Sequence, residues 1–359
     1  MGVEFVNISI STTGLYVTST RDYGTVAIVG DGGTAETDPI LIGTVSEAVT
    51  TFSTSDLGLG VKLALQNGAA KVWAVETGTV TLASIKEGLA KIEGYDVQVV
   101  ALANISETAD NAYISDALAN HVTSAATERI GVFQLAKGED VTTMPTAISG
   151  LLTANSSRLV GIAHNSDNDV ACAVAGVISG LKVDQSPLLK PIEGVTQTVG
   201  FTRTQINALE AVQLNVLVKP TYITSNSPVL GSAYTMGTAL SGINYIDTRR
   251  VIDDLSYKLK STLTDPNIIG EVKINKVGLS VLLNKLAGLM QNCVTTGEID
   301  SYTISIPVLN ALSKTIDSRS EAETTLITTS RTNRAISGQV AIEYSGVVHL
   351  INISVNMSV

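Results

Sequence analysis

A glycine-rich loop after an apolar strand is the feature of this sequence closest to a known chemical site. Residues 26–29 are apolar, and residues 30–35 (GDGGTA) fit the Gly-x-Gly-x-x-Ala spacing of dinucleotide-binding folds. In those folds the loop opens a helix whose N-terminus faces the pyrophosphate. Here Asp38-Pro39 interrupts the run, and residues 40–42 are predicted to form a second strand. This interruption argues against a nucleotide site; a nucleotide-binding α/β enzyme that uses the loop is kept as the alternative function.

The sequence contains few other motifs or side chains of the kinds that carry out catalysis. The sequence has no Gly-Lys-Ser/Thr after a glycine cluster and no Gly-x-Ser-x-Gly, and its three histidines are His121, His164 and His349. His349 falls in a predicted terminal strand, where a cross-strand contact is the better interpretation. Cys172 and Cys293 stand far apart in apolar contexts, which predicts two buried thiols and neither a disulfide nor a zinc site. We expect no enzyme activity, no cofactor and no metal.

An oxygen-rich run precedes an apolar helix in the middle of the chain. Asn165, Asp167 and Asp169 resemble a cation-binding loop, but the glycine and the distal glutamate of such a loop are missing. We therefore predict that Asp169 is the N-cap of the helix over residues 169–181.

Four charged residues lie together at the start of another predicted helix, over residues 247–261. Arg249 and Arg250 are followed four positions later by Asp253 and Asp254, which places opposite charges on one helical face. Two interpretations are equally open: a solvated face with local ion pairs, or charges at a subunit interface.

The composition indicates a protein whose surface meets other protein. Of 359 residues, 44% are hydrophobic and only 16% are charged, against a usual charged fraction of about 25%. The net charge of −10, without basic runs, argues against nucleic-acid or anionic-membrane partners. We expect no membrane contact by the subunit, and a chain that is made and folded in the cytoplasm. The length predicts more than one domain.

The order of predicted elements indicates an α/β part followed by an α+β part. Short apolar strands at 24–29, 40–42, 71–75, 96–101, 129–135 and 158–163 alternate with helices at 46–52, 57–67, 82–93, 109–126, 143–154 and 169–181. Ser46 and Asp56 are predicted N-caps. After residue 245 the pattern changes to long helices at 247–261 and 271–292 and strands at 301–306 and 338–344.

Both ends of the chain read as strands suited to pairing with another chain. The C-terminal strand alternates apolar residues with Asn and Ser and has no Lys or Pro to block pairing. The strand could equally close a sheet within its own subunit. The apolar residues of the two strands are Phe5, Ile8, Ile10, Ile351, Ile353, Val355, Met357 and Val359.

A series of short motifs follows one order along most of the chain. They are GLYV at 14–17, the strand ending at Gly30, Asp38-Pro39, residues 45–52, GAAKVWAV at 68–75, the Ala- and Gly-rich helix at 170–181, Ser186-Pro187, KPIEGV at 190–195, residues 205–218, YIDTRR at 245–250, and a helix with a Leu-x-x-Leu pattern before Gly297. Each is degenerate alone. In this order they resemble the contractile tail sheath family, found in contractile-tailed viruses, R-type bacteriocins and contractile injection systems.

The resemblance implies a multi-domain sheath subunit of α/β and α+β class with extended terminal strands. It implies an N-terminal arm (1–19), an α/β sheath domain (20–245) whose inserted part (about 80–240) lies outward, an inner α+β domain (246–345) and a C-terminal exchange strand (346–359). Such subunits polymerise into a helical, six-fold sheath around an inner tube and contract by changing lattice. A non-contractile capsid or surface-layer protein is a further alternative.

The resemblance also implies the partners. They are other copies of the chain, joined by exchanged terminal strands, the inner tube protein, and baseplate and terminator proteins. Lys273, Lys276 and Lys285 are implied as contacts to an acidic tube surface. A subunit of this kind is made in the host cytoplasm and assembled into a virion tail or contractile particle.

Overall fold

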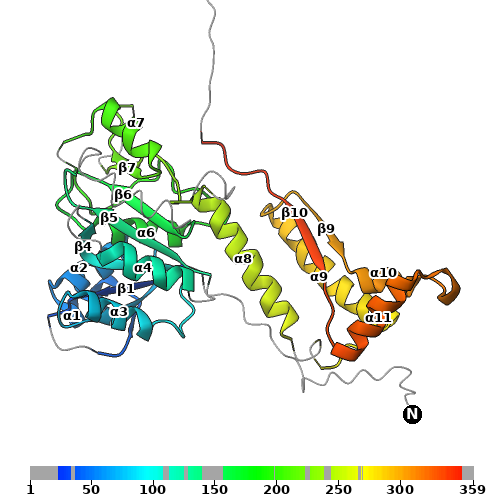
Figure 1. Cartoon of the computed structure of the whole chain (residues 1–359). Coiled ribbons are helices and arrows are strands. Elements are labelled where there is room, and N and C mark those ends of the chain that lie inside the picture. The colour runs from blue at the N-terminus through cyan, green and yellow to red at the C-terminus, as the bar shows by residue number, and fades with distance from the viewer. Residues whose placement is uncertain are drawn as a thin grey trace, which may run out of the picture. The chain divides into compact units, whose positions relative to one another are not determined.

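The chain divides into two compact units, which we call the sheet unit and the small unit. The structure is a computed structural model that describes residues 23–33, 37–107, 113–124, 128–139, 157–197, 199–222, 227–237, 244–265, 268 and 270–349. The sheet unit runs from the first described residue to Leu255 and includes residues 346–349, whereas the small unit is Ser256–Ser345. The division falls within helix α8 (Ile246–Leu263), which is drawn as one continuous helix in Figure 1.

An eight-stranded sheet forms the centre of the sheet unit. Its strand order is β2-β3-β1-β4-β5-β6-β7-β8, and the six strands from β3 to β7 in that order are parallel, with β2 and β8 antiparallel at the two edges. The predicted mixed α/β class is therefore confirmed. The strands are β1 (Thr25–Gly30), β2 (Ile40–Ile42), β3 (Lys71–Glu76), β4 (Val99–Glu107), β5 (Ile130–Leu135), β6 (Leu159–Ala163), β7 (Asn215–Val218) and β8 (Val229–Leu230).

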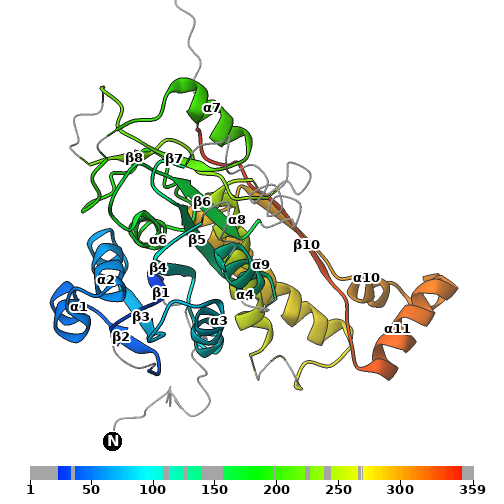
Figure 2. The same ribbon diagram turned by 60° about the vertical axis from the view of Figure 1, so that its left-hand side comes forward.

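Helices cover both faces of this sheet, as Figures 1 and 2 show. One face packs against α1 (Val45–Phe52), α2 (Asp56–Gln66) and α6 (Val170–Gly180). The other packs against α3 (Leu82–Lys91), α4 (Tyr113–Ser124) and α7 (Arg203–Ala211). Because both faces are buried, the strands are continuous apolar runs, as expected for parallel sheets.

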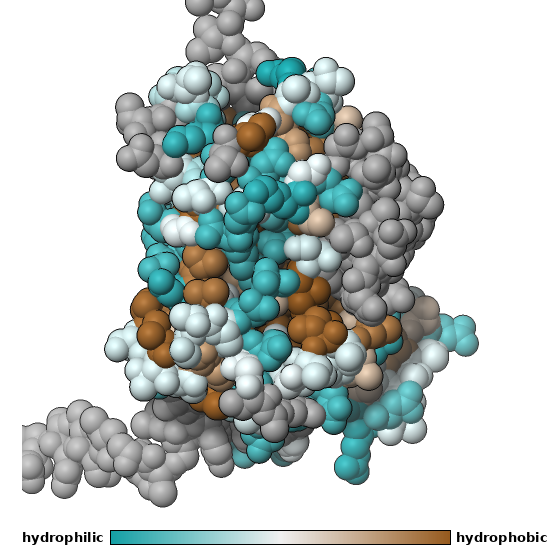
Figure 3. Space-filling model, turned by 90° about the vertical axis from the view of Figure 1, so that its left-hand side faces the viewer, coloured by the Kyte–Doolittle hydropathy of each residue, from teal (hydrophilic) through white to brown (hydrophobic). Residues whose placement is uncertain are grey.

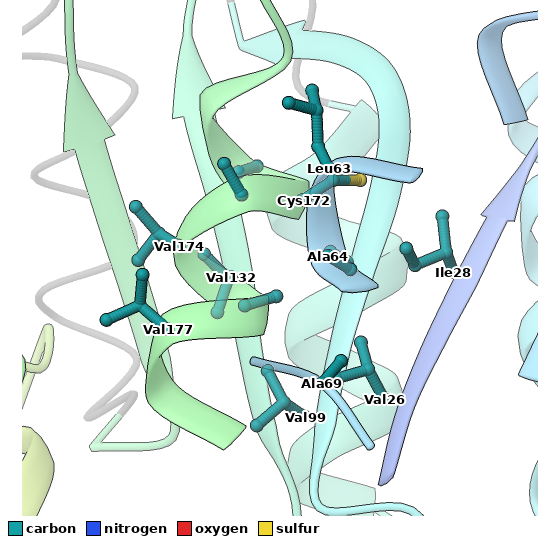
Figure 4. Close-up of a cluster of buried hydrophobic side chains, with 14 of the residues drawn as sticks. Val26, Ile28, Leu63, Ala64, Ala69, Val99, Val132, Cys172, Val174 and Val177 are labelled. Atoms are coloured by element: carbon teal, nitrogen blue, oxygen red, sulfur yellow. The ribbon is translucent and has the colours of Figure 1, made fainter. Parts of the chain in front are cut away.

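The alternation of side chains along each strand divides the core into two layers. On β1, Val26 and Ile28 belong to the cluster with α2 and α6, whereas Ala27 and Val29 belong to the cluster on the opposite face. Figure 4 shows side chains of α6, such as Val174, meeting those of the central strands. The sheet therefore has a full hydrophobic layer on each side.

Two glycines let α2 and α6 approach closely. A Cβ on Gly176 would lie 2.3 Å from the backbone oxygen of Ala64, and one on Gly180 would lie 2.7 Å from the backbone oxygen of Gly68. Any side chain at these positions would push the helices apart. The small residues of α6 therefore serve packing.

The small unit is a helical layer against a two-stranded sheet. Its core includes Leu279, Leu282 and Leu286 of α9 and Leu309 of α10. Strands β9 and β10 pair antiparallel, with Ile304 opposite Val340. The elements after α8 are α9 (Lys276–Thr296), β9 (Ser301–Ser305), α10 (Pro307–Ser313), the 3-10 turn η2 (Ile316–Ser318), α11 (Glu321–Asn333) and β10 (Gln339–Glu343).

Helix α9 is long and apolar enough to cross a membrane, judged by length and composition alone. One such helix is weak evidence for a span, because core helices of globular proteins share these features. Its leucines at 279, 282 and 286 are buried in the core of the small unit at the i, i+3 and i+7 spacing of an amphipathic helix. This stripe accounts for much of the apolar character of α9.

Two of the three predicted helix caps are wrong by one or two residues. Thr44 caps α1 in place of Ser46, and Ser55 caps α2 in place of Asp56. Asp169 is the N-cap of α6, as predicted, and its carboxylate accepts a hydrogen bond from the backbone N–H of Cys172 at 3.1 Å. The helix predicted over residues 143–154 lies outside the described residues.

The surface of the sheet unit carries scattered hydrophobic side chains. Leu41 on β2, Val49 on α1 and Leu59 on α2 are each more than two-fifths exposed. Figure 3 shows hydrophobic residues in small patches separated by hydrophilic ones on the side of the molecule that it faces. Such a surface agrees with the low charged fraction of the sequence.

Candidate functional site

The four charged residues at the start of α8 are buried. Arg249, Arg250, Asp253 and Asp254 are exposed by 8%, 9%, 4% and 2%. Of the two interpretations of these charges, the solvated face is therefore wrong. The expected i,i+4 ion pair between Arg249 and Asp253 is present, but it lies inside the sheet unit.

Asp253 is shared by two arginines. Its two carboxylate oxygens accept hydrogen bonds from Arg158, the residue before β6, at 2.8 and 2.9 Å. Arg249 binds the same carboxylate from the helix that carries Asp253. Arg158 also donates to the backbone oxygen of Arg129 at 3.1 Å. Bidentate pairing of this kind fixes both position and orientation.

Arg250 and Asp254 bind the same half of α8 to two other segments of the sheet unit. Arg250 donates to the backbone oxygens of Leu181 and Lys182, both at 2.8 Å, just after α6 ends. The hydroxyl of Tyr23 donates to Asp254, just before β1. A cavity of about 20 Å³, room for one water, lies among these groups. The first half of α8 is therefore bound to three separate segments of the sheet unit.

The small unit has an apolar groove beside its sheet. The groove encloses about 350 Å³, and its walls come from α8, α9 and the segments around β9 and β10. No residue of β9 or β10 is fully buried, unlike the residues of β1, β5 and β6. The lining residues include Leu259, Leu263, Leu282, Leu286, Ile304 and Ile336.

Both strands of this small sheet have an open edge in the described part of the chain, because each pairs only with the other there. A sheet of two strands is marginally stable alone and gains from a third. The groove and the open edges together make a site suited to an extended, apolar-faced segment.

The lysines predicted to contact an inner tube differ in their surroundings. Lys276, the first residue of α9, and Lys273, three residues before it, are exposed. Lys285 binds the buried carboxylate of Asp265, so its charge is engaged within the small unit. Of the three, Lys273 and Lys276 present their charge most openly.

The predicted strand-exchange residues at both ends, 5–10 and 351–359, lie outside the described residues. The last described residue is His349, which belongs to the sheet unit and contacts Tyr245 and Asp247 there. Its ring lies 4.7 Å from that of Tyr245, edge-on, and its Nε2 lies 3.8 Å from Oδ1 of Asp247. The cross-strand contact expected for His349 is thus replaced by a contact with the start of α8.

The glycine-rich loop lacks the geometry of a dinucleotide site. Strand β2 follows the loop, as predicted, and no helix opens at its glycines in the described residues. A Cβ on Gly32 would lie 2.5 Å from the carboxylate of Glu76, so the glycine makes room for an acidic side chain. A carboxylate at this place repels a phosphate.

The two interior histidines are structural. Burial, and then the charge of Arg129, lower the pKa of His121 to about 4. Burial likewise lowers the pKa of His164 to about 4, and its Nδ1 accepts a hydrogen bond from the backbone N–H of Ser166 at 3.1 Å. Both rings are neutral at pH 7, and a pKa this low makes a weak general base.

Sequence reasoning missed Arg158 and Tyr23 as the partners of α8. Arg158 stands at the start of a predicted buried strand, and a charge at such a place was the one available signal. Its partner Asp253 lies 95 positions away. No local pattern links residues at that separation.

Comparisons with known proteins bear on the fold. No protein-family model matches the sequence, and no curated protein matches it. A chain from the anti-feeding prophage (AFP) baseplate in its contracted state matches with a TM-score of 0.70 and 15% identity over 99% of each chain. A chain from the 6-fold symmetrised AFP baseplate matches with a TM-score of 0.66 and 13% identity over 100% of each. The sheath tail protein from Desulfitobacterium hafniense matches with a TM-score of 0.63 and 11% identity, over 85% of this chain and 93% of that one.

Proposed function

We propose that this chain, which has the fold of a contractile tail sheath protein, is the structural subunit of a contractile sheath. Copies polymerise into a helical, six-fold tube around an inner tube, and a change of lattice drives that tube through a target envelope. The observation that carries the proposal is the fold likeness over the whole chain to chains of a baseplate determined with 6-fold symmetry and in a contracted state.

Subunits are joined by exchanged strands. The C-terminal strand offers five apolar side chains on one face, from Ile351 to Val359, and the groove beside β9 and β10 has the matching apolar lining. Full burial of each side chain contributes roughly 1.5–3 kcal/mol, against an ordering cost of about 1–2 kcal/mol per residue. Because these nearly cancel, backbone pairing and the many repeats of the lattice supply the net stability.

The inner α+β domain (246–345) faces the inner tube, and the inserted part of the α/β domain (about 80–240) faces outward. Helix α9 supports this assignment because its exposed residues, such as Val277, Val281 and Gly288, are mostly uncharged. Lys273 and Lys276 are the exposed cations at its start and would meet an acidic tube surface. Lys285 is a weaker candidate because it already binds Asp265.

Contraction switches nearly rigid subunits between two lattices. The buried ion pairs at α8 support rigidity within the sheet unit, since breaking a buried pair is costly. The energy is stored in the extended lattice at assembly and released on contraction. The partners at the two ends of the tube are baseplate and terminator proteins. The subunit is made in the host cytoplasm and assembled into a tail or contractile particle.

Negative-stain electron microscopy of purified protein tests this function. The full-length chain should form long hollow tubes or stacked six-fold rings, and a chain that ends at Ser345 should not. Ile353→Asp places a charge on the apolar face of the strand and should abolish tubes, whereas Asn352→Asp places the same charge on the polar face and should preserve them.

Three outcomes would count against the proposal. Uniform monomers of the full-length chain would remove self-assembly and favour the nucleotide-binding alternative. Sheets or shells without a hollow centre would favour a capsid or surface-layer protein. Tubes that survive Ile353→Asp would remove the exchanged strand as the link.

A further inference from the structure

We propose that His349 is a positioning residue that holds the root of the C-terminal segment, residues 346–349, against Tyr245 and Asp247 of the sheet unit. The contact itself is independent of the proposed function. Its purpose rests on that function: an anchored root sets the place from which an exchanged strand leaves the subunit.

The contact is specific to His349 within its segment. Its side chain is 18% exposed, whereas the residues before it, Val347 and Val348, are exposed by 42% and 72%. The ring meets Tyr245 edge-on, with an interplanar angle of 86°, which is a favoured arrangement for aromatic pairs. Its Nε2 also lies 3.8 Å from the carboxylate of Asp247, which is 2% exposed. One side chain therefore carries the attachment.

Tyr245 is itself held to the central sheet through a second segment. Its ring lies 5.3 Å from that of Tyr234, and the two residues form an antiparallel bridge. The backbone N–H of Ile246 donates to the oxygen of Ala233 at 3.1 Å. The surface on which His349 rests is thus fixed by backbone hydrogen bonds.

A buried asparagine completes the connection. Asn215 on β7 is fully buried, accepts a hydrogen bond from the backbone N–H of Tyr234 at 2.6 Å and donates to the backbone oxygen of the same residue at 2.8 Å. It also donates to the oxygen of Gly161 on β6 at 3.1 Å. A continuous path of contacts therefore runs from the sheet through Tyr234 and Tyr245 to His349.

This anchor shortens the free tether of the exchanged strand. With His349 held, the last fixed point before the exchanged strand is residue 349; without it, the last described element before that strand is β10, which ends at Glu343. A shorter tether raises the effective concentration of a segment at a site within its reach and leaves fewer residues to order when it binds. The histidine therefore favours docking of the strand in a neighbour without touching that neighbour.

A nitroxide label at residue 348 tests the anchor in subunits isolated before polymerisation. Val348→Cys places the label on an exposed side chain, and the two native thiols, Cys172 and Cys293, are buried. In the electron paramagnetic resonance spectrum, His349→Ala and Tyr245→Ala should each raise the mobile fraction at least threefold. Tyr245→Phe keeps the ring and should match the parent. A label at Val199→Cys, elsewhere on the exposed surface, should not respond to His349→Ala.

The second readout is the protein concentration at which tubes first appear. His349→Ala should raise it severalfold, while Val347→Ala should not. Unchanged label mobility in His349→Ala overturns the anchor, and increased mobility with an unchanged tube threshold overturns its positioning role. Absence of tubes from the parent chain contradicts the proposed function instead, and the label experiment still decides the anchor.

Discussion

Asp253 holds the first half of α8 in place, because arginines from two different elements share its carboxylate. Arg158 comes directly before β6 and Arg249 is in α8 itself, and all three side chains are largely removed from water. Taking charges out of water is costly, so each depends on the others being present. Loss of the central carboxylate would leave two buried cations facing each other.

We predict that Asp253→Asn lowers the free energy of unfolding of the sheet unit by about 3–5 kcal/mol, the usual cost of removing one partner from a buried ion pair. Trp73, the single tryptophan of the chain, lies on β3 and reports on this unit by fluorescence during urea unfolding. Asp38→Asn, at an exposed position, should change the value by less than about 0.5 kcal/mol. Equal effects of the two substitutions would show that the buried pair does not stabilise the unit.

The two buried histidines, His121 and His164, should make the folded state less stable at acid pH. Their folded pKa of about 4 lies below the ordinary value of 6.5, so the unfolded chain binds more protons between these two pH values. Stability is therefore lost as the pH falls through this window. From pH 7 to 5 we expect a loss of about 1–2 kcal/mol for each histidine.

His121→Gln separates this effect from the titration of other groups. The variant should lose about 1–2 kcal/mol less stability than the parent between pH 7 and 5, measured as urea midpoints followed by Trp73 fluorescence. Parallel pH profiles for the two proteins would mean that His121 does not titrate differently in the folded and unfolded states.

At the scale of elements, two helical glycines differ in whether the packing around them leaves room for a side chain. Gly176 on α6 lies where a Cβ would collide with the backbone of α2, whereas Gly288 on α9 has nothing within 4 Å of that position. Packing requires the first glycine. The second is not required by packing within the small unit, and it weakens its helix because glycine has a low helix propensity.

We predict that Gly176→Ala destabilises the protein by about 1–3 kcal/mol through overpacking, and that Gly288→Ala stabilises it by up to about 1 kcal/mol. Differential scanning calorimetry of the two variants and the parent measures both changes in stability, which should have opposite signs. A stabilising Gly176→Ala would contradict the close contact between α2 and α6.

The elements themselves were largely predictable, because apolar runs and helical spacing are local. Residues 40–42 and 71–75 form strands as predicted. Strand β4 continues past its predicted end, since a bulge with Asn104 at a φ of 50° lets the chain resume pairing with β5. The strands β7 and β8 lie in a Pro-, Ser- and Thr-rich stretch and gave no clear alternating signal. The order of the strands in the sheet could not be predicted from local sequence patterns, because it depends on contacts between distant segments.

At the scale of the molecule, only 16% of residues are charged, as the proposed function requires of a subunit whose surface meets other copies of the chain. The charges at the start of α8 are buried inside the sheet unit, whereas the groove beside β9 and β10 is open. Under the proposed function, this groove and the exchanged strands join the subunits. Alternation in the sequence predicts the exchange strands, and that prediction concerns residues outside the described part of the chain. The groove could not be predicted, because its lining comes from α8, α9 and the segments around β9 and β10, which are distant in sequence.

The central claim is that the C-terminal strand of one copy binds the small unit of another. The most direct test places a photo-crosslinking benzoylphenylalanine at Ile353 in tubes assembled from equal amounts of ¹⁴N- and ¹⁵N-labelled subunits, and identifies the crosslinked peptides by mass spectrometry. We predict mixed-isotope crosslinks to peptides that contain groove residues such as Leu263, Leu282 or Val340. Crosslinks only within one isotope, or only to the sheet unit, would contradict strand exchange.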